Sequence, residues 1–95
     1  MFKELNPLLH SELRLGVMSI LISVESADFT YIRKQTGATA GNLSVQLEKL
    51  SQAGYITIEK GYNGKVPRTT CRITKAGTKA FKEYVEALQT YIAKK

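Results

Sequence analysis

Apolar residues recur every three or four positions near both ends of the chain, which predicts two amphipathic helices. The first begins after Ser11, a residue type that caps helix N-termini, and ends near Ser23. The second follows Thr74 as its cap and runs from about Lys75 to the C-terminus. The apolar stripe of this last helix comprises Ala80, Phe81, Tyr84, Val85, Leu88, Tyr91 and Ile92.

Two shorter helices are predicted between these, separated by a tight turn. The first has Asp28 as its N-cap and closes at Thr36-Gly37, where glycine suits a left-handed backbone position. The second has Thr39 as its N-cap and ends at Gly54. Its inner face is marked by Leu43, Leu47 and Leu50. Because the turn is so brief, the two helices cannot overlap in an antiparallel arrangement and are expected to cross, as in DNA-binding helix pairs.

The pattern then changes to alternation, which predicts a β-hairpin. Residues 55–60 alternate between apolar and polar side chains, and Asn63-Gly64 is a strong turn signal. Pro67 restricts the return strand to an edge position near its start. Cys71 and Ile73 share the inward face of that strand.

The order of these elements predicts an α+β, mainly α fold: a winged helix-turn-helix with a three-helix core, a two-stranded β-wing and a long C-terminal dimerisation helix. Ninety-five residues make one domain, spanning 1–95. We divide it into an N-terminal arm at 1–10, a winged-helix core at 11–74 and the C-terminal helix at 75–95.

The third helix is expected to expose a face rich in amides and hydroxyls, because its leucines point inward. Asn42 and Gln46 could each make a bidentate pair with adenine in the major groove, and Val45 suits a thymine methyl group. An ordinary solvated helix face explains any one of these residues equally well. Gly41-Asn42 in the first turn sacrifices helix propensity, however, which favours a contact surface. The residues predicted to contact DNA on this helix are Thr39, Gly41, Asn42, Ser44, Val45, Gln46 and Lys49.

Cations flank the hairpin turn. Lys60, Lys65 and Arg68 are predicted to contact the phosphate backbone or the minor groove. The alternative is that lysine on an edge strand prevents sheets from pairing edge to edge.

Composition supports a polyanionic partner and offers little for catalysis. Lys and Arg number 14 against 8 acidic residues, a net charge of +6. Cys71 is the single cysteine, which excludes an intrachain disulfide and favours a cytoplasmic location and a buried structural thiol. No apolar run reaches transmembrane length. His10 is the only histidine, so we expect no metal site, no cofactor and no enzyme activity.

Several segments together resemble a known family. They are Leu13-Arg14-Leu15, Thr36 to Ser44, Leu47 with Leu50, Ala53-Gly54-Tyr55-Ile56, Gly64 to Thr69 and Arg72 to Gly77. From about Leu5 to Leu88, the chain resembles the small stand-alone winged-helix transcriptional regulators of bacteria and archaea, relatives of the MarR and ArsR types. The resemblance implies a homodimeric DNA-binding regulator without a separate ligand domain. By position it supports Gly41, Asn42, Ser44, Gln46, Lys65 and Arg68. Ala40, Val45 and Gln46 differ from the residues common at these positions in the family. The resemblance therefore does not predict the operator sequence.

The last helix carries more apolar surface than a small core can cover, which predicts a second copy of the chain. The expected interface comprises Leu5, Leu8, Leu9, Phe81, Tyr84, Val85, Leu88, Tyr91 and Ile92. The prediction is therefore a sequence-specific, homodimeric regulator, most simply a repressor, that reads a palindromic site in double-stranded DNA. The alternatives are a protein-interaction adaptor and a non-specific architectural DNA binder. No residue points to a small-molecule effector.

Overall fold

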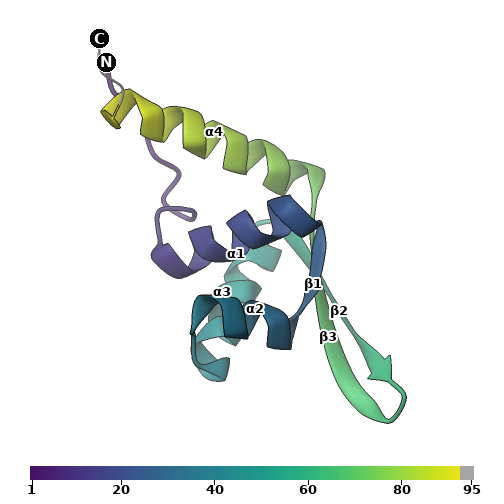
Figure 1. The fold of residues 1–95 in the computed structure, drawn as a ribbon. Helices are drawn as coiled ribbons and strands as arrows, with labels where there is room; N and C mark the ends of the chain where they lie inside the picture. The colour runs from purple at the N-terminus through teal and green to yellow at the C-terminus, as the bar shows by residue number, and fades with distance from the viewer. Residues whose placement is uncertain (93–95) are drawn as a thin grey trace.

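The computed structural model describes residues 1–92 and contains four helices and a three-stranded antiparallel sheet (Figure 1). In chain order the elements are α1 (Glu12–Val24), β1 (Ser26–Asp28), α2 (Phe29–Thr36), α3 (Ala40–Gln52), β2 (Ile56–Asn63), β3 (Val66–Ile73) and α4 (Lys75–Ile92). This order confirms the predicted winged helix with a C-terminal helix. The expectation that the last helix continues to residue 95 concerns residues 93–95, which lie outside the described residues.

The predicted helix caps are confirmed. In each, a side-chain oxygen accepts a hydrogen bond from the backbone N–H three residues later, at 2.8 to 3.5 Å, and the four caps are Ser11, Asp28, Thr39 and Thr74. Gly37 ends α2 with a φ of +72°, the left-handed conformation expected of it. Only residues 37–39 separate α2 from α3.

The sheet has one strand more than predicted. The short β1 pairs with β3, with Ser26 opposite Arg72 and Asp28 opposite Thr70, so the strand order is β1-β3-β2. A strand of three residues is too short to show alternation, which is why the sequence pattern missed it. Pro67 lies in the part of β3 that pairs only with β2, opposite Tyr62, so its predicted edge environment is confirmed.

The hairpin turn lies one residue later than the Asn63-Gly64 signal suggests. Asn63 and Val66 are paired as the last residues of their strands, so the two turn residues are Gly64 and Lys65. Gly64 has a φ of +68°, which glycine adopts at no steric cost at the first turn position. This register places Lys65 at the tip of the wing, which extends away from α4 (Figure 1).

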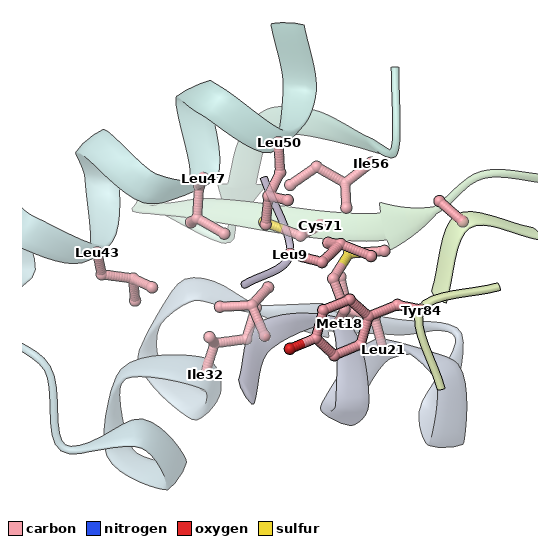
Figure 2. Close-up of a cluster of buried hydrophobic side chains, with 12 residues drawn as sticks. Leu9, Met18, Leu21, Ile32, Leu43, Leu47, Leu50, Ile56, Cys71 and Tyr84 are labelled. Carbon is pink, nitrogen blue, oxygen red and sulfur yellow. The ribbon is translucent and has the colours of Figure 1, made fainter. Parts of the chain in front are cut away.

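One apolar core joins the helices to the sheet, and Figure 2 shows the α3 leucines pointing into it. Leu43, Leu47 and Leu50 are at most 2% exposed, which confirms the predicted inner face of α3. Cys71 is fully buried in the same core, and this burial raises the pKa of its thiol to about 11. The thiol is therefore protonated at neutral pH, as expected of a structural cysteine.

Two residues predicted for the dimer interface belong to this core instead. Leu9 is completely buried and Tyr84 is 4% exposed within a single chain, so neither retains surface for a partner. The prediction was wrong for these two because the arm folds back beneath α4. The hydroxyl of Tyr84 lies 2.9 Å from Nδ1 of His10, which ties α4 to the end of the arm.

The N-terminal arm also runs along the far end of α4, so the start of the chain and the end of α4 lie on one side of the molecule (Figure 1). The backbone N–H of Lys3 donates to Oγ1 of Thr90 at 3.1 Å, and the Tyr91 hydroxyl donates to the Lys3 carbonyl at 3.0 Å. The Phe2 ring stacks on Tyr91 with ring centroids 4.6 Å apart. The arm and α4 thus form one continuous surface.

Candidate nucleic-acid interface

Helix α3 leaves its polar face uncovered, opposite the buried leucines. Six of the seven residues predicted on this face are exposed: Thr39, Gly41, Asn42, Ser44, Val45 and Lys49. The seventh, Gln46, is half-buried. Val45 is 52% exposed, so its methyl groups are accessible on this face. The face therefore offers amide, hydroxyl and methyl groups together on one surface.

Gln46 is more constrained than its place on an outer face suggests. Its Oε1 accepts a hydrogen bond from Nη1 of Arg14 on α1, and its Nε2 donates to Oδ1 of Asn42 at 3.0 Å. The side chain therefore bridges α1 and the first turn of α3. A direct bidentate pair between Gln46 and adenine, as predicted, would require these two hydrogen bonds to break or to be shared.

Two cations that the sequence analysis left out lie beside the start of α3. Arg33 and Lys34 occupy the last turn of α2, and both are exposed. Nε of Arg33 donates to the carbonyl of Ala38 at 3.3 Å, so the guanidinium spans the turn between the two helices. The sequence signal was present, because a basic pair lies one residue before the Thr36-Gly37 turn. These cations add positive charge where a phosphate would meet the N-terminus of α3.

The wing cations divide between two faces of the hairpin. Lys60 pairs with Thr69 across the strands, on the face that continues from the buried Ile56. Arg68 pairs with Gly61, one position closer to the hairpin tip than the Lys60–Thr69 pair. Successive positions alternate between faces, so Arg68 lies on the opposite face. Lys65 stands between the two at the turn. The three predicted wing cations thus surround the tip rather than forming one flat patch.

Ion pairs engage some arginines of the sheet. Arg68 lies 3.5 Å from Asp28, the N-cap of α2, and Arg72 lies 3.8 Å from Glu59. Pairs this exposed contribute little stability, so Arg68 can exchange its carboxylate for a phosphate at small cost. Within residues 1–92, no ion pair engages Lys60 or Lys65.

The two predicted surfaces lie on opposite sides of α1. The residues predicted to contact DNA belong to α3 and the wing, whereas those predicted to form a dimer belong to α4 and the arm (Figure 1). Helix α1 packs against α2 and α3 on one side and against α4 on the other. In the part of the chain that the structure describes, no group of three or more His, Cys, Asp or Glu residues is placed to hold a metal ion. Within residues 1–92, no helix has the length and apolar character of a membrane span.

Comparison with known proteins agrees with this geometry. Residues 13–92 match the family described as the winged helix DNA-binding domain. The chain belongs to this family. An uncharacterized protein of Methanocaldococcus jannaschii, MJ0432, is 34% identical over 82 residues, which cover 84% of this chain and 88% of that protein.

Solved structures show the same fold. A transcriptional regulator homologue from Pyrococcus horikoshii OT3 is 30% identical, with a TM-score of 0.85, and the match covers 92% of this chain and 86% of that one. A MarR-family transcriptional regulator from Silicibacter pomeroyi is 17% identical with a TM-score of 0.70. That match covers 88% of this chain but only 56% of the longer protein, so it shows the shared fold alone. The winged-helix fold expected from the sequence is confirmed, and this MarR-family protein shares it.

Proposed function

We propose that this protein is a homodimeric, sequence-specific transcriptional regulator that represses by occupying a palindromic DNA site. Helix α3 enters the major groove, and the wing lies on the phosphate backbone or in the minor groove. The observation that carries the proposal is the orientation of α3. Its leucines are buried in the core, so its amides, hydroxyls and Val45 face outward, where base edges can be reached.

The exposed groups divide into two roles. Asn42 and Val45 lie on the outward face of α3 and contact bases, with Gln46 behind them. Thr39, Gly41, Ser44 and Lys49 border the base-reading face and contact phosphates, as do Lys60, Lys65 and Arg68 of the wing. Phosphate contacts supply most of the affinity and its salt dependence, while base contacts supply the specificity.

A second copy of the chain is proposed to cover the surface formed by α4 and the arm. Val85, Tyr91 and Ile92 on α4 are 36%, 46% and 63% exposed, and Phe2 on the arm is 66% exposed. Phe81, Leu88, Leu5 and Leu8 lie half-buried beside them. A chain of 95 residues has a marginal core, so burying this strip in a partner would add stability. The dimer would present two α3 helices about 34 Å apart, one turn of B-DNA.

Selection of bound fragments from random double-stranded DNA tests the proposal. The wild-type protein is expected to enrich a two-fold symmetric motif with at least a thousandfold preference over random sequence. Equal affinity for selected and random DNA would indicate an architectural binder, and no DNA binding at moderate salt would indicate an adaptor.

A pair of charge variants separates the wing from the rest of the surface. K65A is expected to weaken binding to all sequences alike and to lower the slope of log affinity against log salt by about one. K79A is the matched control, because Lys79 is equally exposed but lies on α4. Its salt slope is expected to equal that of the wild type. If both variants show the same slope, Lys65 does not contact phosphate.

Sedimentation equilibrium tests the dimer. V85E places a charge within the exposed apolar strip and is expected to yield monomers. Q89E places the same charge on an exposed polar position of the same helix and should leave the dimer intact. A V85E protein that remains dimeric would show that α4 does not form the interface.

A further inference from the structure

A line of hydrogen bonds connects α1 to the outer face of α3. Nε of Arg14 donates to the carbonyl of Leu8, and Nη1 of the same side chain donates to Oε1 of Gln46. Gln46 in turn donates from Nε2 to Oδ1 of Asn42 at 3.0 Å. Three side chains from two helices are therefore joined in series, and the last of them is exposed on the face proposed to read DNA.

The chemistry of the donors sets the direction of every bond in this line. A guanidinium has only donors, so Gln46 must turn its amide oxygen toward Arg14. The amide nitrogen of Gln46 then points toward Asn42, and because this nitrogen only donates, Asn42 must present its oxygen to it. The Nδ2 of Asn42 is left outside this line of hydrogen bonds. Within residues 1–92, no hydrogen bond engages that nitrogen.

Arg14 is well placed to hold this arrangement. It is half-buried, and it is fixed at two points, by the turn that precedes α1 and by Gln46. The Asn42–Gln46 pair spans one helical turn, the spacing at which side chains on a helix meet. Asn42 thus reaches the surface with its amide already oriented, and an oriented group loses less conformational entropy on binding.

We propose that Arg14 is a positioning residue for base recognition: through Gln46, it holds Asn42 with its amide N–H groups outward, so that Asn42 selects guanine or thymine. The acceptors on the major-groove edge are N7 and O6 of guanine, O4 of thymine and N7 of adenine. Adenine N7 lies beside the N6 amino group, which is a donor, so guanine and thymine suit outward N–H groups better. A bidentate pair with adenine needs both the oxygen and the nitrogen of asparagine, and here the oxygen is turned toward Gln46 and already accepts one hydrogen bond from it. This assignment rests on the proposed DNA-binding function and replaces the adenine preference expected from sequence.

Selections from random DNA with wild type and five variants test this assignment. N42A identifies the base position that Asn42 reads, because discrimination is lost there. At that position the wild type is expected to prefer guanine or thymine by about tenfold over the other bases. R14M is expected to lose most of this preference while the rest of the motif is retained. R14K retains a donor toward Gln46, so the same bases should remain preferred.

Q46E provides the sharpest comparison. A carboxylate can still accept from Arg14 but has no N–H for Asn42, so the Asn42 amide would turn its nitrogen inward and its oxygen outward. The preferred base is then expected to switch to adenine or cytosine, whose exposed amino groups are donors. The added negative charge lowers total affinity, but the readout is the identity of the base. Q46E retains the arginine contact, so it remains informative if R14M fails to fold, as judged by thermal melting.

R72M controls for the loss of one arginine charge, because Arg72 pairs with Glu59 on the sheet and does not belong to the network. Its base preferences should match those of the wild type. Adenine at the Asn42 position in the wild type, or unchanged preferences in both R14M and Q46E, would overturn the inference while leaving the regulator proposal standing. A wild-type protein that enriches no motif would overturn the proposed function and this inference with it.

Discussion

A side chain at Gly77, where α4 meets the sheet, is expected to destabilise the fold. This glycine lies in the first turn of α4, directly against the backbone of Tyr55, the residue before β2. A Cβ atom at this position would overlap the Tyr55 carbonyl oxygen. It would also lie 2.9 Å from the carbonyl carbon and 3.1 Å from Cγ1 of Ile73. Backbone atoms cannot rotate away, so G77A must displace α4 or the start of β2.

The expected cost follows from these contacts. Carbon atoms pack best about 3.5–4.0 Å apart, so the backbones must separate by roughly 1 Å. Overpacking of this kind costs about 1–3 kcal/mol, occasionally more. The Tyr55 carbonyl also accepts a hydrogen bond from the backbone N–H of Thr74 at 3.0 Å, whose weakening adds roughly 0.5–1.5 kcal/mol. The higher helix propensity of alanine offsets at most about 1 kcal/mol of this loss in stability. The net loss in the free energy of unfolding should therefore lie between about 0.5 and 4.5 kcal/mol.

Thermal and urea denaturation at a fixed chain concentration measure this loss, and G16A is the matched control. Gly16 lies inside α1, where a Cβ atom would meet only Cγ2 of Thr36 at an ordinary 3.8 Å. Alanine there is expected to raise the free energy of unfolding by about 0.5–1 kcal/mol. G77A should lower Tm by a few degrees or more, while G16A raises it by a few degrees. If G77A has the same Tm as G16A, the close approach of α4 to Tyr55 does not exist in solution.

Two further predictions concern the core and the end of α1. Burial raises the pKa of the Cys71 thiol to about 11 from 9.0, so the unfolded chain releases this proton first as pH rises. Its contribution to stability is present below pH 9 and lost between pH 9 and 11. Between pH 9 and 11, the free energy of unfolding measured in urea should therefore fall more steeply with pH for wild type than for C71A. Equal slopes would contradict this prediction. Glu25 has a φ of +70°, a strained value for a residue with a side chain. E25G should raise the free energy of unfolding by about 1 kcal/mol, whereas E25A, which retains the strain, should not.

The sequence predicted those elements whose chemistry is local. Caps at Ser11 and Thr39 and the turn at Gly37 depend only on residues within four positions, and the structure confirms each. The inward face of α3 followed from leucine spacing for the same reason. Strand β1 was missed because it exists only through its pairing with β3, more than 40 residues later.

The candidate site could be predicted as a surface but not as a network. Exposure of the α3 face follows from helical periodicity, so most of its residues were found from sequence. The link between Arg14 and Gln46 joins positions 32 residues apart, and no pattern within either helix signals it. Burial of Leu9 and Tyr84 was unpredictable for the same reason, because it depends on how the arm folds under α4. Both errors concern apolar or amide groups whose partner could only be known in three dimensions.

Base reading and dimer formation should therefore be separable. Every bond from Arg14 to Asn42 lies within one chain, on the side of α1 away from the exposed strip of α4. A monomeric V85E protein is expected to keep the same preferred base at the Asn42 position in a single half-site. It should lose the added affinity for two half-sites, because linked binding raises the effective concentration of the second contact. Competition between half-site and palindromic duplexes measures both quantities. If V85E loses its base preference as well, the arm, which contacts both α4 and Arg14, transmits the dimer contact to α3.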